Sequence, residues 1–535
     1  MSATEELYRS YLDLRWSFDP AAATAAGVPD QDGRLGSFDR ESLRAHLSAF
    51  KSLASAAEQI EVEDVQEEID RTAFLDEMRV TVFRFEHEKP HVHNPGFWLS
   101  HLFQAVHSLL IRPSDAGGNR ARSLLERLED VPDYLHRARE TLQDPPRVFL
   151  DTAVAMVEGG RSLFQAAAEL GGRERADLAG TLDAACGEAE AALTRFGFAL
   201  HGELRAHPDD QSFAIGEEQF NRRLHHEHAL QATAPELYRY GLHLVDEIEA
   251  EVAAIARTVD ASRPWRDVVE RLRATTPVGG DPVAAFREMM ERARDFVIEH
   301  DLAAIPDGAL EVLETPAFLR PLVPFAAYHP PGPFAEDRTG HFYVTRPDAT
   351  APASPGHDPC TLELAATALH EGYPGHHLHL VTAQSLPSLV RQLTTTPLTV
   401  EGWALYCEEM MAEAGFFRQP EERLFQRLHL LWRAVRIVLD IGLHTRGMTP
   451  PQATDYLVDR LAMDRRKAAA EVSRYCAWPA YQLCYAVGRR EILRLRDAVR
   501  GRDGDRFSLR SFHDEFLTYG GLPVSLIRWG MGLEE

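Results

Sequence analysis

The chain has 535 residues, enough to bury a large core, and its 44% hydrophobic and 26% charged residues are typical of a folded globular protein. Its 57 Lys and Arg residues stand against 82 Asp and Glu residues, which gives a formal net charge of −25 at pH 7. Such a field repels phosphate backbones and anionic lipid, so we expect neither a nucleic-acid partner nor a membrane partner.

The start of the chain and its cysteines indicate an intracellular protein. Glu5 and Glu6 stand where a secretory signal peptide would carry basic residues, and no run of about 18 apolar residues occurs anywhere. The five cysteines are scattered and never spaced C-x-x-C, a pattern typical of buried thiols in a reducing compartment. We therefore predict a cytoplasmic protein.

Helices are predicted over most of the chain. Between residues 5 and 204, apolar positions return every three or four residues in segments rich in Ala, Leu, Glu and Arg, as in amphipathic helices. The same pattern returns in three later segments, 235–258, 281–300 and 402–499. We expect a mostly α protein with an N-terminal helical lobe over 1–210 and a second, catalytic helical lobe over 211–535, packed into one integrated domain.

A region dense in Pro and Gly, residues 321–359, interrupts the helical pattern. Within it, His341-Phe-Tyr-Val-Thr345 alternates bulky β-forming residues between a Gly and a Pro, which predicts a short strand. One small sheet is therefore expected beside the helices.

The segment from Thr361 to Leu380, TLELAATALHEGYPGHHLHL, carries the chemistry. Its uncharged run before His370 and Glu371 predicts a buried helix that delivers a histidine and a glutamate into an interior site. In an H-E-x-x-H helix the two histidines lie about 6 Å apart along the axis and share a face. Here position 374 is Pro rather than His.

On an unbroken helix, one metal ion could not bind two of these histidines. His376 would lie about 9 Å from His370 along the axis and on another side, and His377 would share its face but lie about 10 Å away. Pro374 cannot donate within a helix, and Gly375 permits unusual dihedral angles. We predict a kink over 372–375 that brings His376 back beside His370, with His377 as the alternative.

A catalytic zinc ion needs three protein ligands and one open position. The third ligand is predicted to be Glu401, which begins a new helix 25 residues beyond His376, and Glu408, two turns further along, is the alternative. We expect the cofactor to be Zn²⁺, although imidazole and carboxylate ligands alone do not fix the metal.

The remaining parts of a hydrolytic mechanism are few. Glu371 would take a proton from zinc-bound water, and the metal would polarise a carbonyl group. Tyr485 and His444 are the candidates for donating a hydrogen bond to the developing oxyanion. Asp440, one turn before His444, could orient its ring.

HEGYPGHHLH at 370–379, followed by EGWALYCEE at 401–409, resembles the family named domain of unknown function 885, whose hallmark is H-E-x-x-P-G-H and then E-G-W-A. Weaker landmarks of the family lie at 215–220, 340–343, 436–444, 475–488, 512–514 and 521–523, so the resemblance runs from about residue 215 to the C-terminus. In the family the residue directly after P-G is His, which favours His376. Tyr485 is retained, whereas Tyr481 and Ala486 stand where the family often has Gln and Lys.

That family is similar to the helical zinc peptidases that include thimet oligopeptidase and the carboxypeptidase Taq group. The resemblance implies a two-lobed, zincin-like helical body with a deep cleft. It also implies that the strand at 341–345 forms the rim that pairs with an extended substrate.

Two other histidine clusters are interpreted as structural. His87 and His91 form a literal H-E-x-x-H, but its flanks are polar and Pro90 disfavours helix at the residue before it. His225, His226 and His228 have no acidic pattern that would complete a metal site, so they are expected on a solvated face.

The sequence thus predicts a zinc-dependent hydrolase, a carboxypeptidase-like metallopeptidase that cleaves amide bonds of short peptides. A metal-dependent hydrolase or lyase of a small, non-peptide metabolite is the alternative. A non-catalytic, metal-stabilised binding protein is the second alternative, but a purely structural site needs no general base such as Glu371.

Overall fold

A computed structural model describes residues 3–112, 118–316, 320, 323, 325–346 and 360–533. It is 71% helical and contains one small three-stranded sheet, which confirms the mostly α architecture predicted from the sequence. Within the described residues, no helix is both long and apolar enough to span a membrane.

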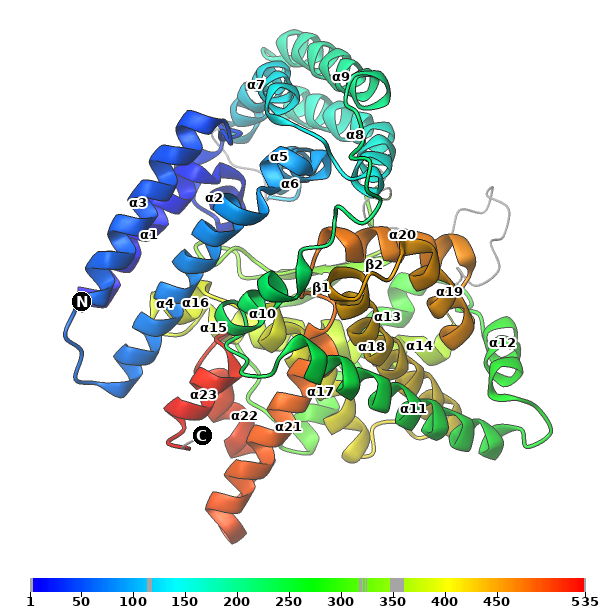
Figure 1. Cartoon of the computed structure of the whole chain (residues 1–535). Helices are drawn as coiled ribbons and strands as arrows, with labels where there is room; N and C mark the ends of the chain where they lie inside the picture. The colour runs from blue at the N-terminus through cyan, green and yellow to red at the C-terminus, as the bar shows by residue number, and fades with distance from the viewer. Residues whose placement is uncertain are drawn as a thin grey trace.

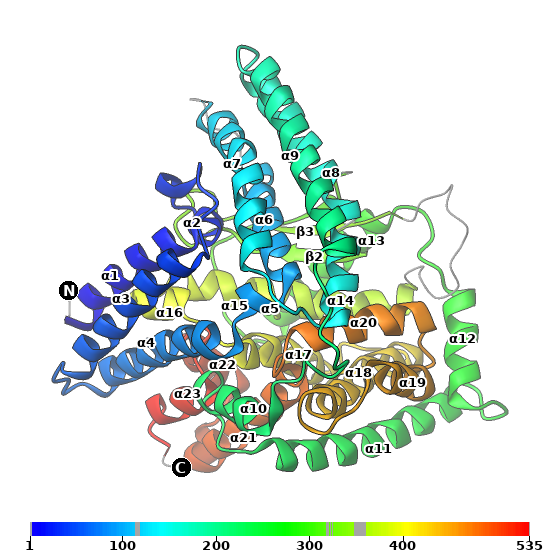
Figure 2. The ribbon, with the colours of Figure 1, turned by 45° about the horizontal axis from the view of Figure 1, so that its top comes forward.

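The N-terminal part of the chain is a stack of helices (Figure 1). Their bounds are α1 (Ala3–Phe18), α2 (Pro20–Ala26), α3 (Arg40–Glu58), α4 (Val65–Phe83), α5 (Pro90–His93), α6 (Pro95–Leu110), α7 (Asn119–Thr141), α8 (Arg147–Glu174) and α9 (Ala179–Gly202), with the short turns η1 (Pro29–Gln31) and η2 (Arg84–Glu88). Helices α7, α8 and α9 pack together and project from one end of the molecule (Figures 1 and 2). Several of these helices have a side-chain cap at their N-terminus. Asp39, for example, accepts hydrogen bonds from two backbone amides of α3.

The rest of the chain adds α10 (Gly216–His226), α11 (Ala234–Val259), α12 (Trp265–Thr275), α13 (Pro282–Glu299), α14 (Thr361–Glu371), α15 (His376–Ala383), α16 (Leu389–Leu393), α17 (Pro397–Glu413), α18 (Pro420–Thr445), α19 (Pro450–Leu461), α20 (Arg465–Ala477), α21 (Cys484–Asp503), η4 (Gly504–Arg506), α22 (Leu509–Leu517) and α23 (Val524–Gly530). Two helix pairs have the most extensive contacts, α11 with α18 and α17 with α21. The second pair carries Glu401 and Tyr485.

The hydrophobic core is formed by residues from distant parts of the chain. Its largest cluster runs from Tyr8 in α1 to Met531 and includes Leu369 and Trp403 of the motif helices. A second cluster joins α10, α11 and α12 with α18 and the start of α21. The division of the chain into lobes near residue 210 stays a prediction.

The sheet contains β1 (Leu310–Glu314), β2 (Ala326–His329) and β3 (Gly340–Val344), in the order β1-β3-β2. The strand predicted at 341–345 is β3, which pairs with β1 in parallel and with β2 antiparallel. Because β3 is bonded on both sides, it cannot be the rim that receives a substrate, and that expectation is wrong. Among the described residues, β1 has no strand partner on the edge away from β3, and it lies beside α13.

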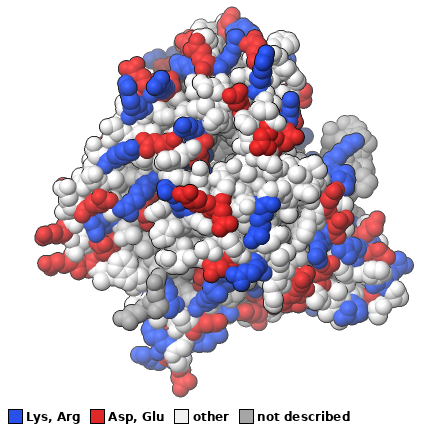
Figure 3. All heavy atoms as spheres, in the orientation of Figure 1, with Lys and Arg blue, Asp and Glu red and all other residues white. Residues whose placement is uncertain are grey.

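Charged side chains of both signs are interspersed over the face of the molecule seen in Figure 3. Some ion pairs of the protein join residues one helical turn apart, as that of Arg9 with Glu5 does. Pairs of this kind on the surface contribute little to stability.

Two glycines set the distance between α17 and α21. A Cβ atom added at Gly402 would lie 2.6 Å from the Cα atom of Gly488, and one added at Gly488 would lie 2.0 Å from the Leu398 carbonyl oxygen. Glu401 directly precedes the first glycine, and Tyr485 lies one turn before the second. The close approach of the two helices therefore sets how near these two side chains come.

Gly402→Ala is expected to destabilise the protein by about 1–3 kcal/mol, because the added methyl group has to push two backbones apart. The matched control is Gly187→Ala on α9, where a Cβ atom meets nothing within 4 Å. That change should stabilise the helix by up to about 1 kcal/mol. Free energies of unfolding from chemical denaturation test both, and equal stability of the two variants would contradict the close packing.

Candidate metal centre

The motif helix ends where the sequence predicts. Helix α14 stops at Glu371, and α15 begins at His376 after a break at 372–375. A Cβ atom on Gly375 would lie 2.0 Å from the His370 carbonyl oxygen, so only glycine fits where the chain folds back. The imidazole rings of His370 and His376 then lie 4.8 Å apart, centroid to centroid. The predicted kink is confirmed.

The break is held in place by α17. The Trp403 indole N–H donates to the Pro374 carbonyl oxygen at 2.9 Å, and the Cys407 thiol donates to the same oxygen at 3.5 Å. Both side chains are fully buried. The helix that satisfies the exposed carbonyl of the break is also the helix that carries Glu401.

His370, His376 and Glu401 come together as the sequence predicts. One ligand atom from each lies within 4.8 Å of the other two, and among the described residues this is the one group of three or more His, Cys, Asp or Glu side chains arranged so. Oε2 of Glu401 lies 3.5 Å from Nε2 of His370 and 3.3 Å from Nε2 of His376. His370 is buried and the other two are half-buried.

Glu408, the alternative ligand, lies on the far side of the His370 ring. Its Oε1 is 2.9 Å from Nδ1 of His370, and its side chain is completely buried. The contact leaves Nε2 of His370 directed toward Glu401 and His376. A carboxylate in this position orients a histidine ligand and makes it more basic.

The electrostatics of the cluster favour a positive charge within it. Burial alone would lower the pKa of His370, but hydrogen bonds with Glu401 and Glu408 raise it to about 9. Burial would likewise raise the pKa of Glu401, yet the two imidazoles hold it well below its usual range. Nδ1 of His376 is buried, and no residue in the described part of the chain forms a hydrogen bond with it.

His377, the alternative to His376, points toward the sheet. Its Nε2 lies 3.4 Å from the Gly308 carbonyl oxygen, and its Nδ1 lies 2.9 Å from the Tyr328 hydroxyl group. A carbonyl only accepts, so Nε2 donates and Nδ1 accepts from the tyrosine. Both ring nitrogens are therefore engaged away from the cluster.

Glu371 is half-buried at the end of α14. Its charge contributes to raising the pKa of His370 and of Tyr328, which places its carboxylate near both rings. No residue in the described part of the chain forms a hydrogen bond with this carboxylate. Its role as a base stays a prediction.

Two tyrosines face the cluster, Tyr485 from the first turn of α21 and Tyr481 from the turn that precedes this helix. The ring of Tyr485 lies parallel to that of His370, with centroids 6.3 Å apart and an interplanar angle of 20°. The Tyr481 hydroxyl donates to Oε1 of Glu401 at 2.7 Å. Sequence reasoning missed Tyr481 as a site residue, because its contact with Glu401 joins residues 80 positions apart in the chain.

His444 is not brought to the cluster. Its Nε2 lies 3.0 Å from the Tyr475 carbonyl oxygen, and its ring packs against Phe213 and Phe220. Burial lowers its pKa to about 4, so it remains neutral. Asp440 does not orient it, because the Asp440 carboxylate accepts hydrogen bonds from backbone amides of another segment.

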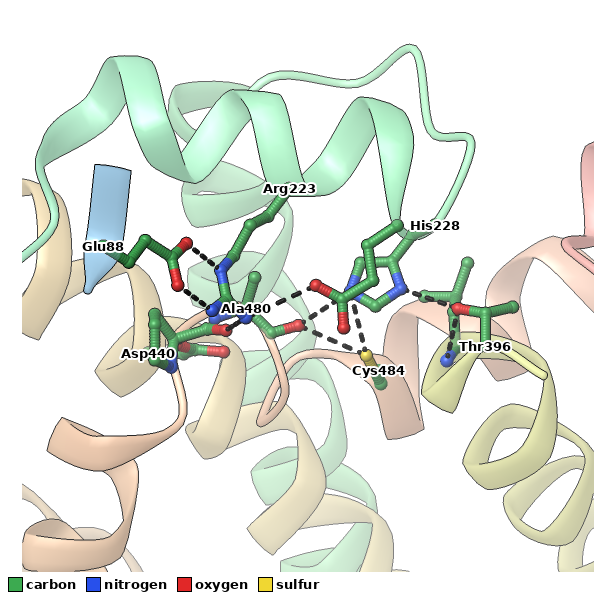
Figure 4. Close-up of polar contacts among 10 residues, drawn as sticks. Glu88, Arg223, His228, Thr396, Asp440, Ala480 and Cys484 are labelled. Carbon is green, nitrogen blue, oxygen red and sulfur yellow. Dashed lines mark hydrogen bonds and ion pairs between the residues drawn. The ribbon is translucent and has the colours of Figure 1, made fainter. Parts of the chain in front are cut away.

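His228 was predicted on a solvated face, and it is instead buried. Its Nδ1 lies 2.8 Å from the Thr396 hydroxyl oxygen and its Nε2 lies 3.0 Å from the Ala480 carbonyl oxygen (Figure 4). Thr396 caps the start of α17, and Ala480 directly precedes Tyr481. The histidine therefore ties together the two segments that deliver Glu401 and its hydrogen-bond donor. The prediction does hold for the neighbouring His225, which is exposed.

A buried polar network supports the turn 479–483, which carries Tyr481 (Figure 4). Arg223 donates from Nη1 to the first carbonyl oxygen of the turn at 3.1 Å and forms a two-point ion pair with Glu88. Asp440 accepts from two backbone amides of the turn, at 3.0 and 3.2 Å. Glu88 belongs to the literal H-E-x-x-H at 87–91, so this motif is part of the scaffold.

Residues 20–531 match the family described as "Bacterial protein of unknown function (DUF885)". The chain belongs to this family, as its motifs at His370 and Glu401 led us to expect. No curated protein matches it.

Two solved structures are similar to the whole chain. A "putative lipoprotein of unknown function" from Shewanella oneidensis has a TM-score of 0.80 and 24% identity and covers 99% of this chain and 100% of its own. A "putative lipoprotein" from Colwellia psychrerythraea has a TM-score of 0.84 and 19% identity and covers 99% of each chain. At these identities the likeness establishes a shared fold.

The prediction of a cytoplasmic protein is wrong on this comparison, because both structural neighbours are described as lipoproteins. The cysteines were a poor guide to the compartment. All five are buried and free. A buried thiol with no second thiol within bonding distance forms no disulfide in any compartment, so its state does not report the compartment.

Asp440 should make stability depend on pH. Burial raises its pKa to about 7, although the backbone amides oppose this shift. The unfolded side chain loses its proton near pH 4. Between these two values the folded state binds more protons, so the Asp440 contribution to stability is lost as pH rises toward 7.

Asp440→Asn should therefore lower the free energy of unfolding and make it depend less on pH. The difference in free energy of unfolding between the wild type and this variant should narrow from pH 5 to pH 8. Chemical denaturation at both values measures the gap. The matched control is Asp455→Asn at an exposed position of α19. A gap for Asp440→Asn that widens with pH would contradict the raised pKa.

Proposed function

We propose that His370, His376 and Glu401 bind one zinc ion and that the protein is a zinc-dependent hydrolase that cleaves amide bonds of short peptides. The observation that carries this proposal is the convergence of the three ligand atoms beside a carboxylate, Glu371, that has no hydrogen-bond partner in the described part of the structure.

The donor set suits zinc. Two imidazole nitrogens and one carboxylate oxygen, with a fourth position left for water, form a recurrent catalytic zinc set. Oε1 of Glu408 on Nδ1 of His370 provides the outer contact that metal-bound histidines usually have. The raised pKa of His370 and the lowered pKa of Glu401 support the same conclusion, because a cation would replace the charge that a proton supplies there.

A zinc ion held there would supply a Lewis acid that polarises a carbonyl group and makes water acidic. Glu371 would accept the proton of the attacking water, since it directly follows His370 and has no hydrogen-bond partner among the described residues. Tyr481 orients the Glu401 carboxylate by donating to its other oxygen. Tyr485 remains protonated because burial and the charge of Glu401 raise its pKa, so it can donate to the oxyanion that develops.

A groove beside β1 favours a peptide as the substrate. It has a volume of about 560 Å³ and runs between β1 and α13, from Gly308 to Leu313 on one side and from Arg287 to Arg294 on the other. Tyr373, two residues from Glu371, lines it as well. We propose that the substrate binds in this groove and not at β3, where the sequence predicted it. We also propose that the groove is the cleft of a zincin-like body.

The backbone of β1 is available for pairing in this groove. The residues just outside the two ends of β1 form backbone hydrogen bonds with β3. The Ala309 carbonyl oxygen accepts from an amide of β3, and the Thr315 amide donates to a carbonyl oxygen of β3. In a parallel pair alternate residues bond to the same neighbour, so the amides of Leu310, Val312 and Glu314 face the opposite edge. Arg287 donates to the Val312 carbonyl oxygen at that edge. An extended peptide can add to such an edge as a further strand.

Glu371→Gln is expected to retain zinc and lose about 10²–10⁴-fold in kcat, because it keeps the shape of the side chain but removes the base. Hydrolysis of a library of short peptides and the zinc content by elemental analysis measure the two properties. Glu363→Gln, on the same helix and paired with Arg273, is the matched control and should keep both.

His376→Asn should lower the zinc content to well below one equivalent, and His225→Asn, at an exposed position, should not. Chelation of the wild-type protein should abolish hydrolysis, and added zinc should restore it. Peptide hydrolysis that persists in the chelated protein, or in Glu371→Gln, would overturn the proposed function. A full equivalent of zinc in His376→Asn would overturn the ligand set.

A further inference from the structure

The arginines of α18 that turn into the protein have carboxylate partners, with one exception. Arg427 forms ion pairs with Glu409 at 2.6 Å and with a second glutamate at 2.9 Å. Arg436 donates to the Tyr475 hydroxyl oxygen at 3.0 Å and lies 3.4 Å from Glu471. These pairs satisfy the guanidinium groups within the fold.

Arg433 is the exception. Its one described hydrogen bond runs from Nη1 to the His429 carbonyl oxygen at 3.4 Å, and its Nε is buried without a partner. No carboxylate in the described part of the structure lies within ion-pair distance of it. Burial lowers its pKa more than the charges of Glu408 and Glu401 raise it, so the charge is only partly compensated. A half-buried guanidinium in this state is unfavourable unless an anion pairs with it.

This guanidinium lies beside the metal centre. It sits 5.8 Å from the ring centroid of Tyr485, and the ring of Tyr485 stacks over His370 at 6.3 Å. Glu408 and Glu401 are the carboxylates whose charges act on Arg433, and both are already engaged by the histidines of the cluster. The terminal Nη groups of Arg433 are therefore the donors left for a molecule bound at the site.

We propose that Arg433 binds the terminal carboxylate of a peptide whose scissile amide lies at the metal centre, which makes the protein a carboxypeptidase. This inference rests on the proposed function. One residue of extended chain spans at most about 3.6 Å, so an anchor for the terminal carboxylate has to lie close to the reacting carbonyl group. Arg433 meets this need in outline, because it lies against the same Tyr485 ring as His370. The planar guanidinium offers two parallel N–H donors that match the two oxygens of a carboxylate.

The charges around Arg433 favour a monoanion. Glu401 and Glu408 lie close enough to act on it, so a phosphate with two negative charges would be repelled more strongly than a carboxylate. Arg436, the other guanidinium beside Tyr485, is already engaged by Tyr475 and Glu471. One guanidinium is therefore left for an anion, whereas phosphate sites usually gather several donors.

The test compares pairs of peptides of the same sequence with a free C-terminal carboxylate or a C-terminal amide. The zinc-loaded wild-type protein should cleave the free acids with a kcat/KM at least about 30-fold higher, the size expected for one buried charge pair. In Arg433→Gln this preference should be lost, because kcat/KM should fall for the free acids and stay the same for the amides. Arg433→Lys keeps the positive charge but not the two parallel N–H donors, and it should retain part of the preference for free acids.

Arg423→Gln, on the same helix and half-buried beside Glu409, is the matched control and should keep the preference. Calorimetric binding of an N-acetyl dipeptide to zinc-loaded Glu371→Gln protein, with and without Arg433→Gln, provides a readout apart from turnover. Binding of the free acid should weaken at least about 30-fold with the arginine removed, and binding of the amide should not change.

The outcomes separate the two claims. Cleavage of acids and amides at equal rates, unchanged in Arg433→Gln, would overturn the carboxylate anchor and leave the zinc hydrolase intact. Absence of cleavage of any peptide, with carboxylate binding that requires Arg433, would overturn the hydrolase and leave the anchor. Carboxylate binding unchanged in both Arg433 variants would overturn the anchor whether or not the protein turns over.

Discussion

The hydrogen bond from the Trp403 indole N–H to the Pro374 carbonyl oxygen, 2.9 Å long, is the contact on which the candidate site depends. Two imidazoles six residues apart meet only if the helix between them is broken, and a break leaves buried backbone groups that need partners. Trp403 supplies one. Because Trp403 lies two residues after Glu401, the helix that stabilises the break also brings the carboxylate to both imidazoles.

The position of α17 is fixed at further points. Thr396 caps its first turn and is bonded to His228, which also holds the turn 479–483. Gly402 sets its distance from α21. The site is thus built on rigid helices and supported by buried polar contacts, and such support is what keeps reactive side chains in one geometry without a ligand. The cost of burying three ionisable side chains together is borne by this scaffold.

The part of the site that could be predicted from the sequence is the part set by local backbone chemistry. Pro374 and Gly375 exclude a regular helix wherever they occur, so the kink and the pairing of His370 with His376 followed from their spacing. Tyr481, His228 and β1 could not be found in this way, because their contacts join residues 30 or more positions apart in the chain. A helical spacing shows which residues share a face, but not which distant segment covers that face.

The interpretation of His444 failed for the same reason. Asp440 lies one turn away on the same helix, and local spacing made it the partner of the histidine. Its carboxylate is instead used by backbone amides of the turn 479–483, which have few other acceptors once they are buried. A buried backbone amide has to be satisfied wherever the chain places it, whereas a histidine can bond to any carbonyl oxygen, as His444 does to that of Tyr475. When backbone amides and a histidine compete for one carboxylate, the carboxylate bonds to the amides. Asp440 therefore supports the candidate site by holding the turn that carries Tyr481, and not by orienting His444.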